Sequence, residues 1–166
     1  MAAVHASEAS PAGQGSIRAV VLAGLAGGAV DFVYACGVAL VHGRSLLRPW
    51  QGVASGWIGK AAGEGGLATA ALGVVTHFAI ATCMAAAFAL VASRLRQLYA
   101  RPLAAGAVYG LVLYGVMYGL VLPLRFPARF PRWDGVQSLT DIAAHVGVGL
   151  AIAAVLSRSA RAPLNR

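Results

Sequence analysis

The sequence predicts an all-α membrane protein: a four-transmembrane-helix bundle with a short interfacial helix between spans one and two. Of the 166 residues, 59% are hydrophobic and 11% are charged, and the mean hydropathy is +0.74. That composition leaves too little polar surface to cover a soluble globule. Four apolar runs are long enough to cross a hydrocarbon core about 30 Å thick, which takes roughly 20 helical residues. Small residues recur at four-residue spacing in these runs, as is typical of helices that pack in lipid.

The predicted spans are 19–41, 67–93, 102–123 and 138–157. The first contains one charged residue, Asp31, and the second contains none. The third begins with Pro102, a favourable first helical residue, and is expected to end at Pro123. The fourth span, from Ser138 to Ser157, has the least sharply marked start, since its apolar run is uninterrupted only from Ile142 onward.

The spans belong to a single domain over 18–158, between a flexible N-terminal tail over 1–17 and a C-terminal tail over 159–166. The N-terminal tail lacks a basic region and precedes a hydrophobic run longer than that of a signal peptide. We therefore expect the first span to be retained.

Two segments between the spans are predicted to lie at the membrane surface. Residues 46–62 place two tryptophans near one helical face behind Pro49, beside basic residues, which predicts an interfacial helix. Residues 124–136 repeat an Arg-Phe-Pro unit that excludes a regular helix and supplies arginine and aromatic side chains. The predicted membrane-interface anchors are Trp50, Trp57 and Trp133.

The formal net charge of +8 comes from 13 basic and 5 acidic residues. The basic residues lie at span ends, in loops and in the termini, and they form no continuous basic face, so lipid headgroups are favoured as their partners over nucleic acid. An even number of spans places both termini on one side. Because Arg94, Arg96 and Arg101 crowd one short loop on that side, the positive-inside rule predicts cytoplasmic termini.

Each span carries a seam of small residues through which helices can approach closely. Span one has the seam Gly24/Gly28, span three has Gly106/Gly110 and Gly115/Gly119, and span four has Gly147/Ala151. In span two the seam is formed by Ala70, Gly73, His77, Ala81 and Ala85. They predict a compact bundle, and a seam left over would allow homo-oligomerisation.

Ionisable side chains inside a span are costly and usually face protein or water, which makes them the candidate functional residues. Depths counted from the midpoint of each span place one polar side chain from every helix within about one helical turn. This polar layer is predicted to contain Asp31, His77, Tyr114, Asp141 and His145, with Tyr34 and Tyr118 extending it outwards. Asp141 and His145 are four residues apart and therefore lie on the same face of their helix.

Each of these residues also has a purely structural interpretation. Asp141 would complete a capping box begun by Ser138, at the start of the fourth span. His77 and His145 would form hydrogen bonds to tyrosines or to the backbone across the bundle. Asp31 is harder to explain in this way, since a carboxylate in mid-span must be protonated, paired or hydrated.

Three segments carry a resemblance to a known family: LGVVTHFAIA around His77, RPLAAGAVYG running to VLPL in the third span, and TDIAAHVGVGLAIA around His145. They resemble the YagU-type inner-membrane proteins, bacterial multi-span proteins of unknown molecular function. The resemblance covers about 72–156 and depends on the two histidines, Pro123 and Asp141. It implies a multi-pass protein of the bacterial inner (cytoplasmic) membrane. This chain is shorter than the YagU-type proteins, lacks a long first loop and has a glycine-rich first span. The resemblance therefore assigns no role to Asp31, which lies in that span.

Three functions remain open. A proton or ion relay, or a pH-responsive element, would use two imidazoles and two carboxylates at similar depth. A haem b or divalent-metal site would use His77 and His145, with Asp31 as a further metal ligand and Asp141 orienting the nearby ring. A structural or accessory subunit would use the polar layer only to fix helix register. No catalytic residue is predicted, since the nucleotide-loop, zinc-protease and Cys-x-x-Cys motifs are lacking, and the first and third functions need no cofactor.

Overall fold

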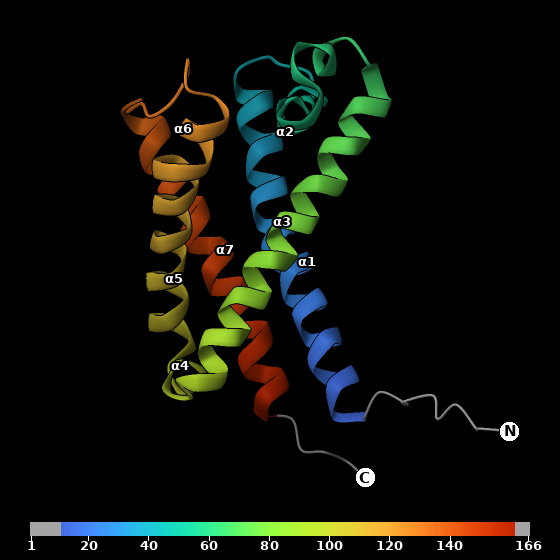
Figure 1. The fold of residues 1–166 in the computed structure, drawn as a ribbon. Helices are drawn as coiled ribbons and strands as arrows, with labels where there is room; N and C mark the ends of the chain where they lie inside the picture. Colours follow the sequence, from blue (N-terminus) through green and yellow to red (C-terminus); the bar gives the residue numbers. More distant parts are fainter. Residues whose placement is uncertain (1–10, 162–166) are drawn as a thin grey trace, which may run out of the picture.

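The computed structural model describes residues 11–161, which form a row of helices without any β-strand in that range (Figure 1). The long helices are α1 (Pro11–Val41), α3 (Gly66–Arg94), α5 (Pro102–Val116) and α7 (Val136–Arg161). The shorter elements are α2 (Arg48–Ile58), the 3₁₀ helix η1 (Gly59–Gly63), α4 (Gln97–Ala100), the π-helical turn η2 (Met117–Val121) and α6 (Leu122–Arg125).

Four helical segments are long and apolar enough to cross a membrane: Ile17–Val41, Gly66–Arg94, Pro102–Arg125 and Val136–Arg161. The predicted all-helical fold with four long apolar helices is therefore confirmed. Its ends differ in detail, since α1 begins at Pro11, inside the predicted N-terminal tail, and α7 continues to Arg161. The remainder of the two predicted tails, 1–10 and 162–166, lies outside the described residues.

The helices pack in the order α3, α1, α7, α5. The start of α1, the end of α7 and α4 lie at one end of the molecule, and α2 and α6 lie at the other (Figure 1). Near α4, the Tyr109 hydroxyl of α5 donates to the Met84 carbonyl of α3 at 2.7 Å, and the Tyr109 ring meets Phe88 edge-on. Towards α2 and α6 the same two helices diverge (Figure 1). The bundle is thus open at one end, unlike the compact bundle expected from the seams.

Glycines set the closest helix contacts, as predicted. A side chain at Gly110 would overlap the His145 carbonyl and the Val146 Cα of α7, and Gly106 has the same relation to Gly149. In α1, Gly24 packs on Thr82 of α3, and Gly28 packs on its Phe78. These seams join α5 to α7 and α1 to α3, whereas no seam joins α3 to α5, which is the physical reason for the open end.

The predicted interfacial segment does form a helix, α2, but one side of it packs against α3. The Trp50 carbonyl occupies the space that a side chain at Gly73 would fill, and Trp57 Nε1 donates to Thr76 Oγ1 at 3.0 Å. The Trp50 ring is 4% exposed and stacks on Phe32 with ring centroids 4.3 Å apart. Of the three predicted anchors, Trp57 and Trp133 are exposed, while Trp50 packs between helices.

The third span was expected to end at Pro123. In the structure it continues past this proline, through α6, to Arg125. Proline has no N–H for the preceding turn, and its ring crowds the carbonyl four residues earlier. The π-helical turn η2 lies directly before it and widens the helix there, a common way to absorb such a conflict.

Candidate functional site

A cavity of about 1120 Å³ lies between α1, α2, α3, α7 and the η2–α6 segment. Along α1 its lining runs from Gly27 to Ala39, a rise of about 18 Å, and then reaches Arg44. Most of its wall is apolar. Six of the seven residues predicted for the polar layer and its extension line it: Asp31, Tyr34, His77, Tyr118, Asp141 and His145.

One wall of the cavity holds Asp31 of α1 and His77 of α3. His77 Nε2 donates to the Gly28 carbonyl at 2.9 Å, so it carries a hydrogen. The other ring nitrogen, Nδ1, lies 3.8 Å from Asp31 Oδ2, and the two side chains are 12% and 28% exposed. Because a carbonyl accepts the hydrogen of Nε2, Nδ1 is the ring nitrogen that faces the carboxylate.

Aromatic rings enclose the His77 imidazole. The centroids of the Trp50 and Phe78 rings each lie 5.2 Å from the centroid of His77. The small Gly28 backbone lets α1 come close enough for its carbonyl to reach the imidazole. Sequence spacing along α1 and α3 therefore correctly predicted that Asp31 and His77 lie at one depth.

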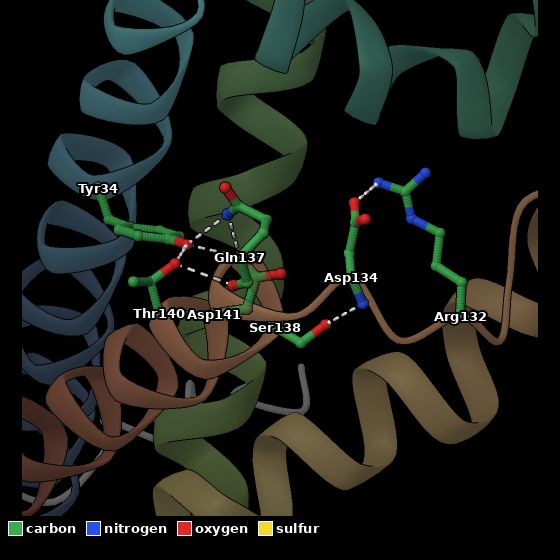
Figure 2. Close-up of polar contacts among 7 residues, drawn as sticks. All are labelled: Tyr34, Arg132, Asp134, Gln137, Ser138, Thr140 and Asp141. Atoms are coloured by element: carbon green, nitrogen blue, oxygen red, sulfur yellow. Dashed lines mark hydrogen bonds and ion pairs between the residues drawn. The ribbon is translucent and has the colours of Figure 1, made fainter.

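A hydrogen-bonded network between α1 and α7 lies in the cavity lining about one turn further along α1 (Figure 2). The Tyr34 hydroxyl donates to Asp141 Oδ1 at 2.6 Å. Gln137 Nε2 donates to the same oxygen at 2.9 Å and to the Tyr34 hydroxyl at 2.7 Å, and the Thr140 hydroxyl lies 2.9 Å from that of Tyr34. The Asp141 side chain, in a residue only 9% exposed, thus has two donors for one carboxylate oxygen.

The capping-box interpretation of Asp141 is wrong. The helix α7 begins at Val136, two residues before the predicted start, which puts Asp141 in the second turn. The Ser138 hydroxyl instead accepts a hydrogen bond from the Asp134 backbone N–H at 2.8 Å (Figure 2). Gly135, with φ of 56°, allows the turn that starts the helix early.

His145 lies one turn further along α7 and lines the cavity. Its Nδ1 donates to the Asp141 carbonyl at 2.9 Å, and among residues 11–161 its Nε2 has no hydrogen-bond partner. The rings of Tyr114 and Tyr118 both meet it edge-on at 5.7 Å and stack on each other at 4.5 Å. Tyr114 itself does not line the cavity, unlike the other six residues of the predicted polar layer and its extension.

Sequence reasoning missed Gln137 and the basic end of the cavity. The signal for Gln137 was available, because it lies four residues before Asp141 on the same helical face. The basic end is lined by Arg44, Arg48 and Arg125, and Arg125 donates from Nε and Nη2 to the Gly56 carbonyl of α2. These arginines had been assigned only to the headgroup layer in general.

Within the described part of the chain, no group of three or more His, Cys, Asp or Glu side chains is placed to hold a metal ion. Comparison of the chain with protein-family models, with curated proteins and with solved structures finds no match. The chemistry of this cavity is therefore the basis for a proposed function.

Proposed function

We propose that the protein is a multi-pass integral membrane protein that relays protons in response to pH through the cavity lined by Asp31, His77, Asp141 and His145. The four long apolar helices support the membrane location. The resemblance to YagU-type proteins and the arginine-dense loop around α4 support the bacterial inner membrane with cytoplasmic termini.

The observation that carries this proposal is that Asp31 Oδ2 and His77 Nδ1 lie 3.8 Å apart in the lining of one cavity, which Asp141 and His145 also line. Imidazole is the side chain whose charge ordinarily changes between pH 5 and 8. Each ring uses one nitrogen for a backbone carbonyl and presents the other towards the cavity or its carboxylate. The site can thus take up and release protons while both rings stay in place.

An accessory role is the second candidate, and the hydrogen bonds favour it in one respect. The His77–Gly28 and Tyr34–Asp141 contacts tie α1 to α3 and to α7, which is what register-setting polar groups do. Among residues 11–161, no third His, Cys, Asp or Glu side chain joins Asp31 and His77, so the geometry does not favour a divalent-metal site there.

Proton flux in proteoliposomes with a trapped pH indicator distinguishes these candidates. After a pH step, Asp31→Asn is expected to lower the flux about 10²-fold, the typical cost of removing a positioned proton-transfer group. The matched control is Asp134→Asn, a loop carboxylate that pairs with Arg132 outside the cavity. Equal flux in wild type, Asp31→Asn and His77→Gln, with unchanged thermal unfolding, would contradict the relay and leave the accessory role.

We also propose self-association through a seam that the bundle leaves open. A side chain at Gly115 or Gly119 would meet no atom within 4 Å, unlike one at Gly106 or Gly110. Close backbone approach by a second copy is the usual use of such a pair in lipid.

Replacing Gly115 and Gly119 together with leucine is expected to shift the protein from dimer to monomer in chemical cross-linking and in size-exclusion chromatography with light scattering. Gly37→Leu is the control, since Gly37 also has open space but lies on α1. A monomeric wild type, or a dimer equally weakened by Gly37→Leu, would refute this interface.

A further inference from the structure

We infer that the cavity binds an anionic lipid, with its phosphate headgroup at Arg44, Arg48 and Arg125 and an acyl chain along the apolar wall between α3 and the η2–α6 segment. This inference does not depend on the proton relay, because the arginines lie apart from the acidic and histidine side chains along the length of the cavity.

The charges at the open end lack carboxylate partners. Among the described residues, the ion pairs are His77–Asp31 and Arg132–Asp134, so none of the three arginines that line the cavity is paired with an acid. The Gly56 carbonyl accepts hydrogen bonds from Nε and Nη2 of Arg125 and so holds its guanidinium between α6 and α2. Guanidinium groups match phosphate oxygens in geometry and charge.

The wall below these arginines is suited to a hydrocarbon chain. Ile80 and Met84 of α3 line one side, and Met117, Val121 and Leu122 line the other. The two helices diverge towards this end (Figure 1), and the volume exceeds the usual 300–1,000 Å³ of small-molecule pockets. An amphipathic molecule would bury its chain here and leave its head at the helix ends, where the headgroups of the bilayer lie.

The order of charges favours an anion over a cationic amphiphile. The carboxylates lie deeper and already have partners, His77 for Asp31, and Tyr34 and Gln137 for Asp141. A cation would have to pass three unpaired arginines to reach them, at a like-charge cost. The unsatisfied charge in the cavity is therefore positive and at its outer end.

Native mass spectrometry of the detergent-purified protein, titrated with phosphatidylglycerol or phosphatidylcholine, tests this inference. The wild type is expected to retain phosphatidylglycerol in preference. One arginine near an anionic lipid is worth about fivefold in affinity, so Arg48→Gln is expected to lose about fivefold, and Arg44, Arg48 and Arg125 all changed to Gln about 100-fold. Met117→Trp, which fills the apolar wall without changing charge, is expected to weaken the same binding.

The matched control replaces Arg94, Arg96 and Arg101 with Gln, three arginines at the opposite end of the molecule. Equal losses in both triple variants, equal binding of the two lipids, or no effect of Met117→Trp would overturn the inference. So would full displacement of phosphatidylglycerol by glycerol phosphate, which marks a simple anion site, or preferential binding of dodecyltrimethylammonium. Thermal unfolding in the same detergent shows whether each variant is folded. If the variant with all three arginines replaced does not fold, the loss of affinity in Arg48→Gln tests the inference by itself.

Discussion

Replacing Gly110 with valine is expected to lower the free energy of unfolding by about 3 kcal/mol. A side chain at Gly110 would overlap the carbonyl of His145 and the Cα of Val146. Both are backbone atoms of α7 and cannot rotate away, so α5 and α7 must separate along their contact, at the upper end of the cost of overpacking. Thermal unfolding in detergent, followed by circular dichroism, measures the loss.

Gly37→Val is the matched control for this change. Gly37 lies within α1, outside the proposed self-association seam, and a side chain there would meet no atom within 4 Å. Any loss of stability in the control therefore reports helix propensity and lipid contact alone. Equal losses in the two variants would show that the α5–α7 seam does not contribute to stability.

Replacing Tyr34 with phenylalanine is expected to lower the free energy of unfolding by about 1.5 kcal/mol near neutral pH. The change removes only the hydroxyl, which donates to Asp141 Oδ1 at 2.6 Å. Interhelical hydrogen bonds in membrane proteins average about 0.6 kcal/mol, but a charged acceptor makes the bond stronger. Tyr114→Phe is the control, since Tyr114 packs against Tyr118 and His145 through its ring.

A loss of about 0.6 kcal/mol would show that the Asp141 carboxylate makes this hydrogen bond no stronger than an ordinary interhelical one. A difference as small as that of Tyr114→Phe would show that this bond does not stabilise the protein.

The spans and most seams could be predicted because hydropathy and small-residue spacing are properties of each helix alone. Depth along a helix is equally local, at 1.5 Å per residue, and it correctly brought Asp31 to the level of His77. Rotation about the helix axis is not local. Tyr114 has the expected depth, yet its ring lies behind Tyr118, because the packing of α5 on α7 sets which side of α5 faces the cavity.

The remaining errors arose where two distant segments decide the structure together. Trp50 looked like a surface anchor, but its place depends on Gly73, which admits α2 against α3. Arg125 was assigned only to the headgroup layer in general, and its contact with the Gly56 carbonyl of α2 depends on the helix that continues through Pro123. No pattern within either segment indicates the other.

His77 and His145 present opposite ring nitrogens, Nδ1 and Nε2, because a backbone carbonyl holds the remaining nitrogen of each. A proton can therefore arrive at either imidazole without a flip of the ring about its side-chain bonds. In the proposed proton relay, the rate of protonation would then depend on how fast water delivers protons into the cavity, and not on the slower rearrangement of packed side chains. A solvent isotope effect on the response, together with weak dependence on the fluidity of the surrounding lipid, would be the signature of such a preset pair.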